Sequence, residues 1–127
     1  MTIQDQVIGA LTAWRENRGG GTPGMQSVIN VLVNRAAKRG TSVYAEAVRR
    51  WQFSSMTAPG DPNLDLFPAD NDPQWQQALI LAVEAATSLQ DITGGATSYY
   101  ALSMPKPPYW AASMTETCRI AGQVFFK

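Results

Sequence analysis

The sequence predicts one α+β domain, mainly helical, with a small irregular β region in its C-terminal half. Before residue 91, apolar residues recur every three or four positions, which is the period of amphipathic helices. After Asp91 the chain is rich in Gly, Pro and aromatic residues, a pattern typical of short strands and loops. Its 127 residues have the length of a single domain, residues 1–127.

The first two predicted helices are separated by a run of glycines. The first follows Thr2, a suitable N-cap, and ends before Gly19–Gly21. Its apolar stripe consists of Ile3, Val7, Leu11 and Trp14. The second begins near Pro23, ends at Gly40 and is apolar on several faces. We therefore expect this second helix to be the buried central one.

Two shorter helical segments and a long loop follow. A third helix is predicted over residues 42–50 and a fourth after Pro73. Residues 56–73 are too long for an ordinary connection, and such loops are often functional. This loop contains Asp61, Asp65, Asp70 and Asp72. Residues 115–120, around Cys118, indicate a strand with a small buried thiol.

The composition excludes several classes of chemistry. There is no histidine, so Ser-His and Cys-His nucleophile pairs and His-ligated zinc are absent. The single cysteine cannot form an intramolecular disulfide or a structural zinc site. Ten basic and ten acidic residues balance, which disfavours nucleic-acid binding. We expect no cofactor and no metal. Carboxylates remain, and they are the groups that cleave glycosides.

Glu16 is the first candidate for a catalytic group. It lies at the end of the first predicted helix, about 200° around the helix from Trp14. This position favours a solvated carboxylate paired with Arg15 or Arg18. A catalytic role instead requires a cleft on that side of the helix, where loss of water would suit a general acid. The residues alone leave both interpretations open.

Two other segments carry side chains suited to binding sugars. Gln52 and Ser54 alternate with aromatic residues, so they can line a cleft together. The same alternation also fits a short connecting strand whose Trp51 and Phe53 belong to the core. Residues 93–100, together with Trp110, offer aromatic faces on which sugar rings stack. The candidates there are Tyr99, Tyr100 and Trp110.

A set of short motifs runs in order along the chain. A glutamate is followed by a Gly-rich gap, a helix start, an Asn-Arg pair and five further motifs. They are Glu16, Gly24–Val28, Val31–Arg35, Gln52–Ser54, Asp91–Ala96, Tyr99–Tyr100, Pro108–Trp110 and Ile120–Phe126. This set, from about Leu11 to Phe126, resembles the SleB-type cell wall hydrolases. That family includes spore-cortex lytic enzymes and related phage and bacterial peptidoglycan hydrolases.

The resemblance implies a lysozyme-like fold related to lytic transglycosylases, with residues 1–127 as one catalytic domain. It matches Glu16 to the family's catalytic glutamate and so favours the cleft over the solvated position. The motif positions that line the cleft are Gln52, Ser54, Tyr99 and Tyr100. The chain departs from the family's pattern at three positions, which bears on substrate contacts. Ser98 stands where relatives often have Tyr or His, Gln123 where they often have His, and Ala101 where the motif has Asn.

From this resemblance we expect a peptidoglycan-degrading glycosidase, with a lytic transglycosylase as the first interpretation. Glu16 would protonate the oxygen that links N-acetylmuramic acid to N-acetylglucosamine, and then deprotonate the muramic acid 6-hydroxyl. A hydrolysing muramidase is the alternative in the same fold. It needs a second carboxylate, for which the aspartates of residues 61–72 are the source. A non-catalytic glycan-binding or virion structural module is the alternative from another class.

Peptidoglycan glycan strands are the expected partner of a monomeric protein. The first residues lack the basic and apolar regions of a signal peptide, and no apolar stretch approaches the ~20 residues of a membrane span. We therefore expect synthesis in the cytoplasm without a signal peptide, no membrane insertion and action on the cell wall in the periplasm. This resembles phage endolysins, which depend on a holin-type permeabilising partner.

Overall fold

The computed structural model describes residues 1–127 and places a bundle of helices before a three-stranded sheet. The helices are α1 (Ile3–Asn17), α2 (Gly21–Arg39), α3 (Val43–Ala47), α4 (Ser54–Thr57) and α5 (Pro73–Ala85). The strands are β1 (Ser98–Ala101), β2 (Glu116–Ile120) and β3 (Gln123–Phe126), all antiparallel in the order β1-β3-β2. Short 3-10 helices span Arg18–Gly20 and Tyr109–Ser113. The predicted mainly helical α+β class is confirmed.

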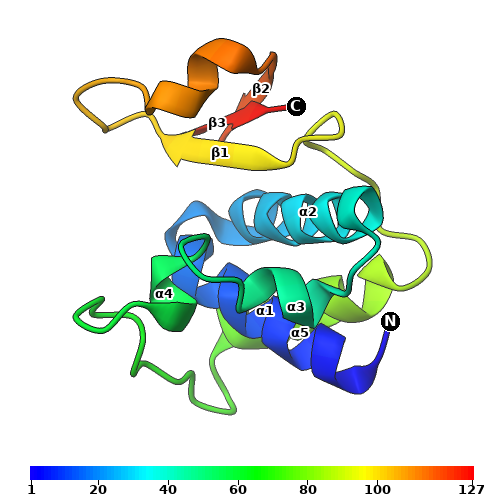
Figure 1. The fold of residues 1–127 in the computed structure, drawn as a ribbon. Coiled ribbons are helices and arrows are strands. Elements are labelled where there is room, and N and C mark those ends of the chain that lie inside the picture. Colours follow the sequence, from blue (N-terminus) through cyan, green and yellow to red (C-terminus); the bar gives the residue numbers. More distant parts are fainter.

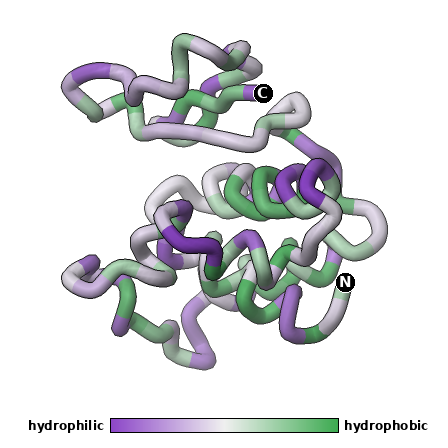
Figure 2. Tube along the Cα trace, viewed as in Figure 1, coloured by the Kyte–Doolittle hydropathy of each residue, from purple (hydrophilic) through white to green (hydrophobic).

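Helix α2 lies between the sheet and the other helices (Figure 1). One face packs Met25 and Leu32 into the main core, while Val31 contacts the sheet through Phe125. The helix ends at Gly40, whose φ of 66° is left-handed and easily adopted by glycine. Figure 2 shows hydrophobic residues in the middle of this helix and hydrophilic residues at its end. The expectation of a buried central helix is confirmed.

None of the helices is both long and apolar enough to cross a membrane.

The predicted apolar stripe of α1 is wrong in its first half. Ile3 is 79% exposed and Val7 is 42% exposed, whereas Ala10 and Ala13 are fully buried. Small side chains let α1 approach α2 and α5 closely, so the helix buries its alanines rather than its larger residues. In the second half of the stripe, Trp14 lies in the core, 6% exposed, and Leu11 is partly buried against that core.

The segment before α4 is not a strand. The third helix ends at Ala47, turns follow, and Ser54 begins a short helix. Phe53 is 1% exposed in the core, as expected, but Trp51 is 81% exposed and has a φ of 70°. The interpretation as a connecting strand with both aromatics in the core is therefore wrong for Trp51. The turn at Trp51 directs the two rings to different environments.

The long loop between α4 and α5 is partly fixed by its aspartates. Asp72 caps α5 by accepting hydrogen bonds from the Gln74 and Trp75 amides. It also accepts a hydrogen bond of 3.1 Å from the Trp14 indole, which ties this end of the loop to α1. Cys118 lies in β2, as predicted, and is half-buried rather than fully buried.

Candidate active site

Glu16 lies in the last turn of α1 and is held between two hydroxyl groups. The Tyr99 hydroxyl donates a hydrogen bond of 2.6 Å to Oε1, and the Ser55 hydroxyl donates one of 2.6 Å to Oε2. The side chain is half-buried and forms no ion pair with Arg15 or Arg18. The solvated, arginine-paired position is therefore not the one the fold adopts. Both carboxylate oxygens are fixed by groups from other elements.

Arg15 holds α4 against the end of α1. Its side chain is 6% exposed, and its guanidinium donates to the backbone oxygens of Ser55, at 3.1 Å, and Leu66, at 3.0 Å. The first bond anchors the residue whose hydroxyl contacts Glu16. Charge-assisted hydrogen bonds are stronger than neutral ones, so this buried arginine fixes the hydroxyl's position.

Gly24 lies at the close junction between α1 and α2. A Cβ atom on Gly24 would lie 2.9 Å from the side-chain amide nitrogen of Asn17 and 3.1 Å from the Asn17 backbone oxygen. A larger residue would displace the Asn17 side chain and shift its backbone oxygen by a few tenths of an ångström, so glycine gives the closest packing of α2 against the end of α1. This close approach determines where Glu16, one residue before Asn17, lies relative to the central helix.

Tyr99 reaches Glu16 from the sheet. In β1 its ring lies 5.4 Å from the Phe125 ring and 6.5 Å from the Phe53 ring, centroid to centroid. Burial, followed by the charge of Glu16 and the hydrogen bond to it, raises the pKa of the Tyr99 hydroxyl well above its usual value. The hydroxyl therefore stays protonated and remains a donor to the carboxylate.

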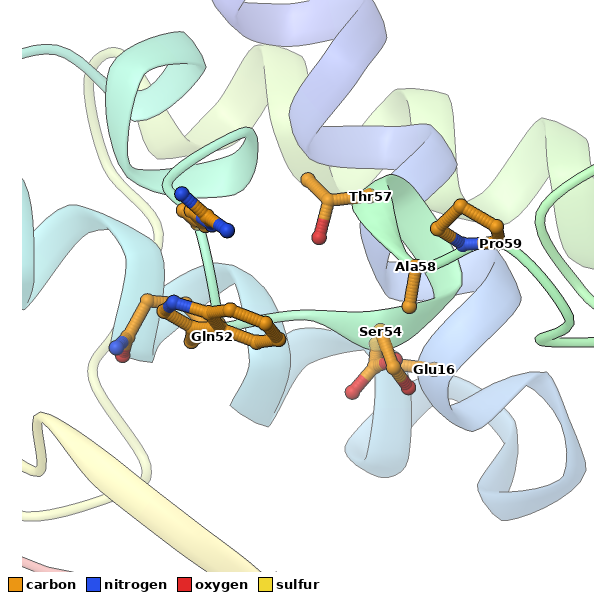
Figure 3. Close-up of a pocket in the computed structure, with 8 residues that line it drawn as sticks. Glu16, Gln52, Ser54, Thr57, Ala58 and Pro59 are labelled. Carbon is orange, nitrogen blue, oxygen red and sulfur yellow. The ribbon is translucent and has the colours of Figure 1, made fainter.

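Two adjoining cavities lie beside Glu16 and Tyr99. The first, about 510 Å³, is lined by Glu16, Gln52 and Ser54 together with Thr57, Ala58 and Pro59 (Figure 3). The second, about 490 Å³, is lined by Tyr99 and Trp110 among others. Gln52 borders both cavities, and the Tyr99–Glu16 hydrogen bond joins one to the other. Together they form a groove between the helices and the sheet.

The structure brings four of the five expected binding residues to this groove. Gln52 and Ser54 lie in the cavity of Glu16, Tyr99 bonds to Glu16, and Trp110 lines the second cavity. Tyr100 does not converge on Glu16. Its ring stacks on Phe126 at 5.6 Å, because successive residues of a strand face opposite sides of the sheet.

Ser55 and Arg15 are site residues that the sequence did not reveal. A strand through residues 50–55 would direct Ser55 away from Ser54 and Gln52. The helical turn at Ser54–Thr57 instead directs the Ser55 hydroxyl to Glu16. No local signal predicts that contact. Arg15 is adjacent to Glu16 in the sequence, which suggests an ion pair with that carboxylate. In the structure Arg15 instead binds the backbone oxygen of Ser55.

Comparison with known proteins identifies the family. The sequence profile of the family described as Cell Wall Hydrolase matches residues 19–126. The chain belongs to the cell wall hydrolase family. Its members degrade peptidoglycan, so this chain is an enzyme whose substrate is the bacterial wall. No curated protein matches it in sequence.

Two solved structures resemble this cell wall hydrolase in fold. The catalytic domain of the germination-specific lytic transglycosylase SleB from Bacillus anthracis has a TM-score of 0.76 and 20% identity, covering 100% of this chain and 97% of that one. The catalytic domain of the Bacillus cereus SleB protein has a TM-score of 0.75 and 22% identity, covering 100% of this chain and 92% of that one. The predicted SleB-type family is confirmed.

Replacing Tyr99 with Phe in this cell wall hydrolase should lower the rate of wall cleavage about tenfold. The variant loses one hydrogen bond to a charged group, worth about 1.5 kcal/mol, which corresponds to about one factor of ten. Solubilisation of dye-labelled sacculi measures the rate. Tyr100→Phe is the matched control, because the ring of Tyr100 faces away from Glu16. Equal rates for the two variants would contradict a positioning role for Tyr99.

Proposed function

We propose that the chain is a peptidoglycan lytic transglycosylase with Glu16 as its general acid and base. The proposed bond is the one between N-acetylmuramic acid and N-acetylglucosamine. The matched family supports the substrate class, and the SleB structures, one of them named a lytic transglycosylase, support the reaction type by analogy of fold.

The mechanism needs one carboxyl group and two proton transfers. Protonated Glu16 gives its proton to the glycosidic oxygen, the bond to the muramic acid C1 breaks, and an oxocarbenium-like centre develops there. The resulting carboxylate then takes the proton of the 6-hydroxyl of the same sugar. That oxygen attacks C1 and closes a 1,6-anhydro ring, so no water is consumed. The hydroxyls of Tyr99 and Ser55 hold the two carboxylate oxygens, which fixes the direction of both transfers.

The observation that carries this proposal is the absence of a second carboxylate in the groove. Glu16 is the only acidic residue that lines either cavity. A hydrolase that follows the usual two-carboxylate mechanism would need a second one to activate water or to attack C1. Gln52 and Ser54 supply hydrogen-bonding groups for the sugar, and Trp110 supplies an aromatic wall.

The product distinguishes the two reactions. We expect muropeptides that end in 1,6-anhydro-muramic acid, which lack a reducing end and are one water lighter than the products of hydrolysis. Mass spectrometry of digested sacculi, without chemical reduction, measures this mass difference directly. Predominantly reducing muramic acid ends would contradict the proposal and identify a muramidase.

A specific contact indicates where a muramidase would find its second carboxylate. Asp61 accepts a hydrogen bond of 2.6 Å from the hydroxyl of Ser54, which lies in the same cavity as Glu16. Reducing ends that disappear in Asp61→Asn would therefore assign the hydrolytic role to that residue. The monomeric state, the periplasmic site of action and the dependence on a holin-type partner stay predictions.

A further inference from the structure

Trp51 is an exposed indole on a strained backbone. Its side chain is 81% exposed, although tryptophan is normally among the most buried residues. Its φ of 70° lies in the left-handed region, which a bulky side chain rarely adopts and which glycine adopts without penalty. Neither feature helps the chain to fold. Strain of this kind concentrates at functional sites, where surrounding structure maintains it.

The indole lies where the two cavities of the groove meet. Trp51 lines the cavity of Glu16 and also the adjoining cavity of Tyr99. The Arg50 guanidinium lies over the ring, 4.7 Å from its centroid, which orients the indole by a cation–π contact on one face. The strained turn and the arginine together hold a flat apolar surface at the junction of the two cavities.

A second exposed aromatic borders the same groove. Tyr109 is 94% exposed and lines the second cavity with Trp51 and Trp110. It comes from the start of the 3-10 helix that spans Tyr109–Ser113, on the sheet side of the groove, whereas Trp51 comes from the helical side. Pyranose rings present apolar C–H faces that pack on aromatic rings, so such a pair suits a saccharide chain.

We propose that Trp51 is a sugar-stacking residue that binds a pyranose ring of the glycan strand beside Glu16, with Tyr109 contacting the strand farther along the groove. This inference rests on the proposed function, because it takes a peptidoglycan glycan strand as the ligand. The stacked ring positions the strand, while Glu16 acts on the bond at the cavity that both residues share. Trp51 thus contributes to binding and takes no part in proton transfer.

The first test uses Trp51→Gly, which removes the indole and suits the backbone. With soluble, uncross-linked glycan strands as substrate, we expect KM to rise about tenfold and kcat to stay within about twofold. The Tm should stay unchanged or rise, because glycine relieves the strain at this φ. Trp51→Phe should keep most of the affinity. Tyr44→Ala, an exposed aromatic outside both cavities, should leave KM unchanged.

A lower Tm for Trp51→Gly, or a KM equal to that of the unchanged protein, would overturn the proposal. So would a Trp51→Phe variant as impaired as Trp51→Gly. A loss confined to kcat would also contradict it, because it would show that the indole acts on the reaction and not on binding.

A binding measurement separates this inference from the proposed reaction. In a Glu16→Gln background, saturating glycan strands should protect the exposed Trp51 indole from iodide quenching of its fluorescence, and most of that protection should be lost in Glu16→Gln/Trp51→Gly, where Trp110 is the tryptophan left in the groove. Absence of protection with intact strands would refute stacking, whatever products the active enzyme makes. Conversely, protection together with reducing-end products would retain the stacking residue and reject the transglycosylase.

Discussion

Replacing Glu16 with Gln is expected to reduce the release of soluble fragments from purified sacculi by at least about 100-fold. General acid and base catalysis contributes about 10²- to 10⁴-fold to a rate, and the amide can supply neither function. The fold should remain, because Gln has the same shape and the Tyr99 and Ser55 hydroxyls can still bond to it. We expect the free energy of unfolding to change by about 1 kcal/mol or less.

Fragment release and thermal unfolding, measured on the same preparation, check both parts of this expectation. Glu84→Gln is the matched control, because Glu84 is exposed on α5 and lies outside both cavities. It should behave as the unchanged protein. A Glu16→Gln variant with more than a few per cent of the original activity would show that another group is the acid.

Replacing Phe53 with Ala should have the largest effect on stability. The ring is 1% exposed in the main core, 6.5 Å from the Tyr99 ring and 5.1 Å from the Arg35 guanidinium. Truncating a buried phenylalanine costs about 3–5 kcal/mol, through lost burial and the cavity that remains. Because this ring joins the helical core to β1, the loss should also loosen the contact between Tyr99 and Glu16.

Urea unfolding measures that loss as a lower midpoint. The same substitution at Phe67, whose ring is 73% exposed, is the control and should cost about 1 kcal/mol or less. Similar losses at the two positions would show that Phe53 does not join the helices to the sheet energetically.

The predicted helix boundaries are confirmed where neighbouring residues specify them. Gly40 ends α2 because a left-handed turn favours glycine, and Asp72 with Pro73 begins α5 because the aspartate caps the helix and proline suits its first turn. The order of helices before strands also follows from local periodicity. These features depend on neighbouring residues, so a sequence read alone can supply them.

The predictions that failed concern which way a side chain points. The small size of Ala10 and Ala13 allows close helix packing, so α1 buries them and leaves Ile3 exposed. The alternating spacing favours one face for Trp51 and Phe53, but the left-handed turn at Trp51 leaves its ring exposed while the Phe53 ring is buried. Such outcomes depend on contacts with distant elements, which periodicity does not contain.

The sequence by itself indicated the class of the fold, and its resemblance to the SleB-type family indicated the family and Glu16 as the candidate acid. It also limited the chemistry, since a chain without histidine must rely on carboxylates and hydroxyls. Only the tertiary structure decided that Glu16 faces a groove and is held by Ser55, a contact across 39 residues, and by Tyr99, a contact across 83 residues. The physical reason is that hydrogen bonds between distant segments depend on how helices and strands pack, and that packing leaves no local pattern in the chain.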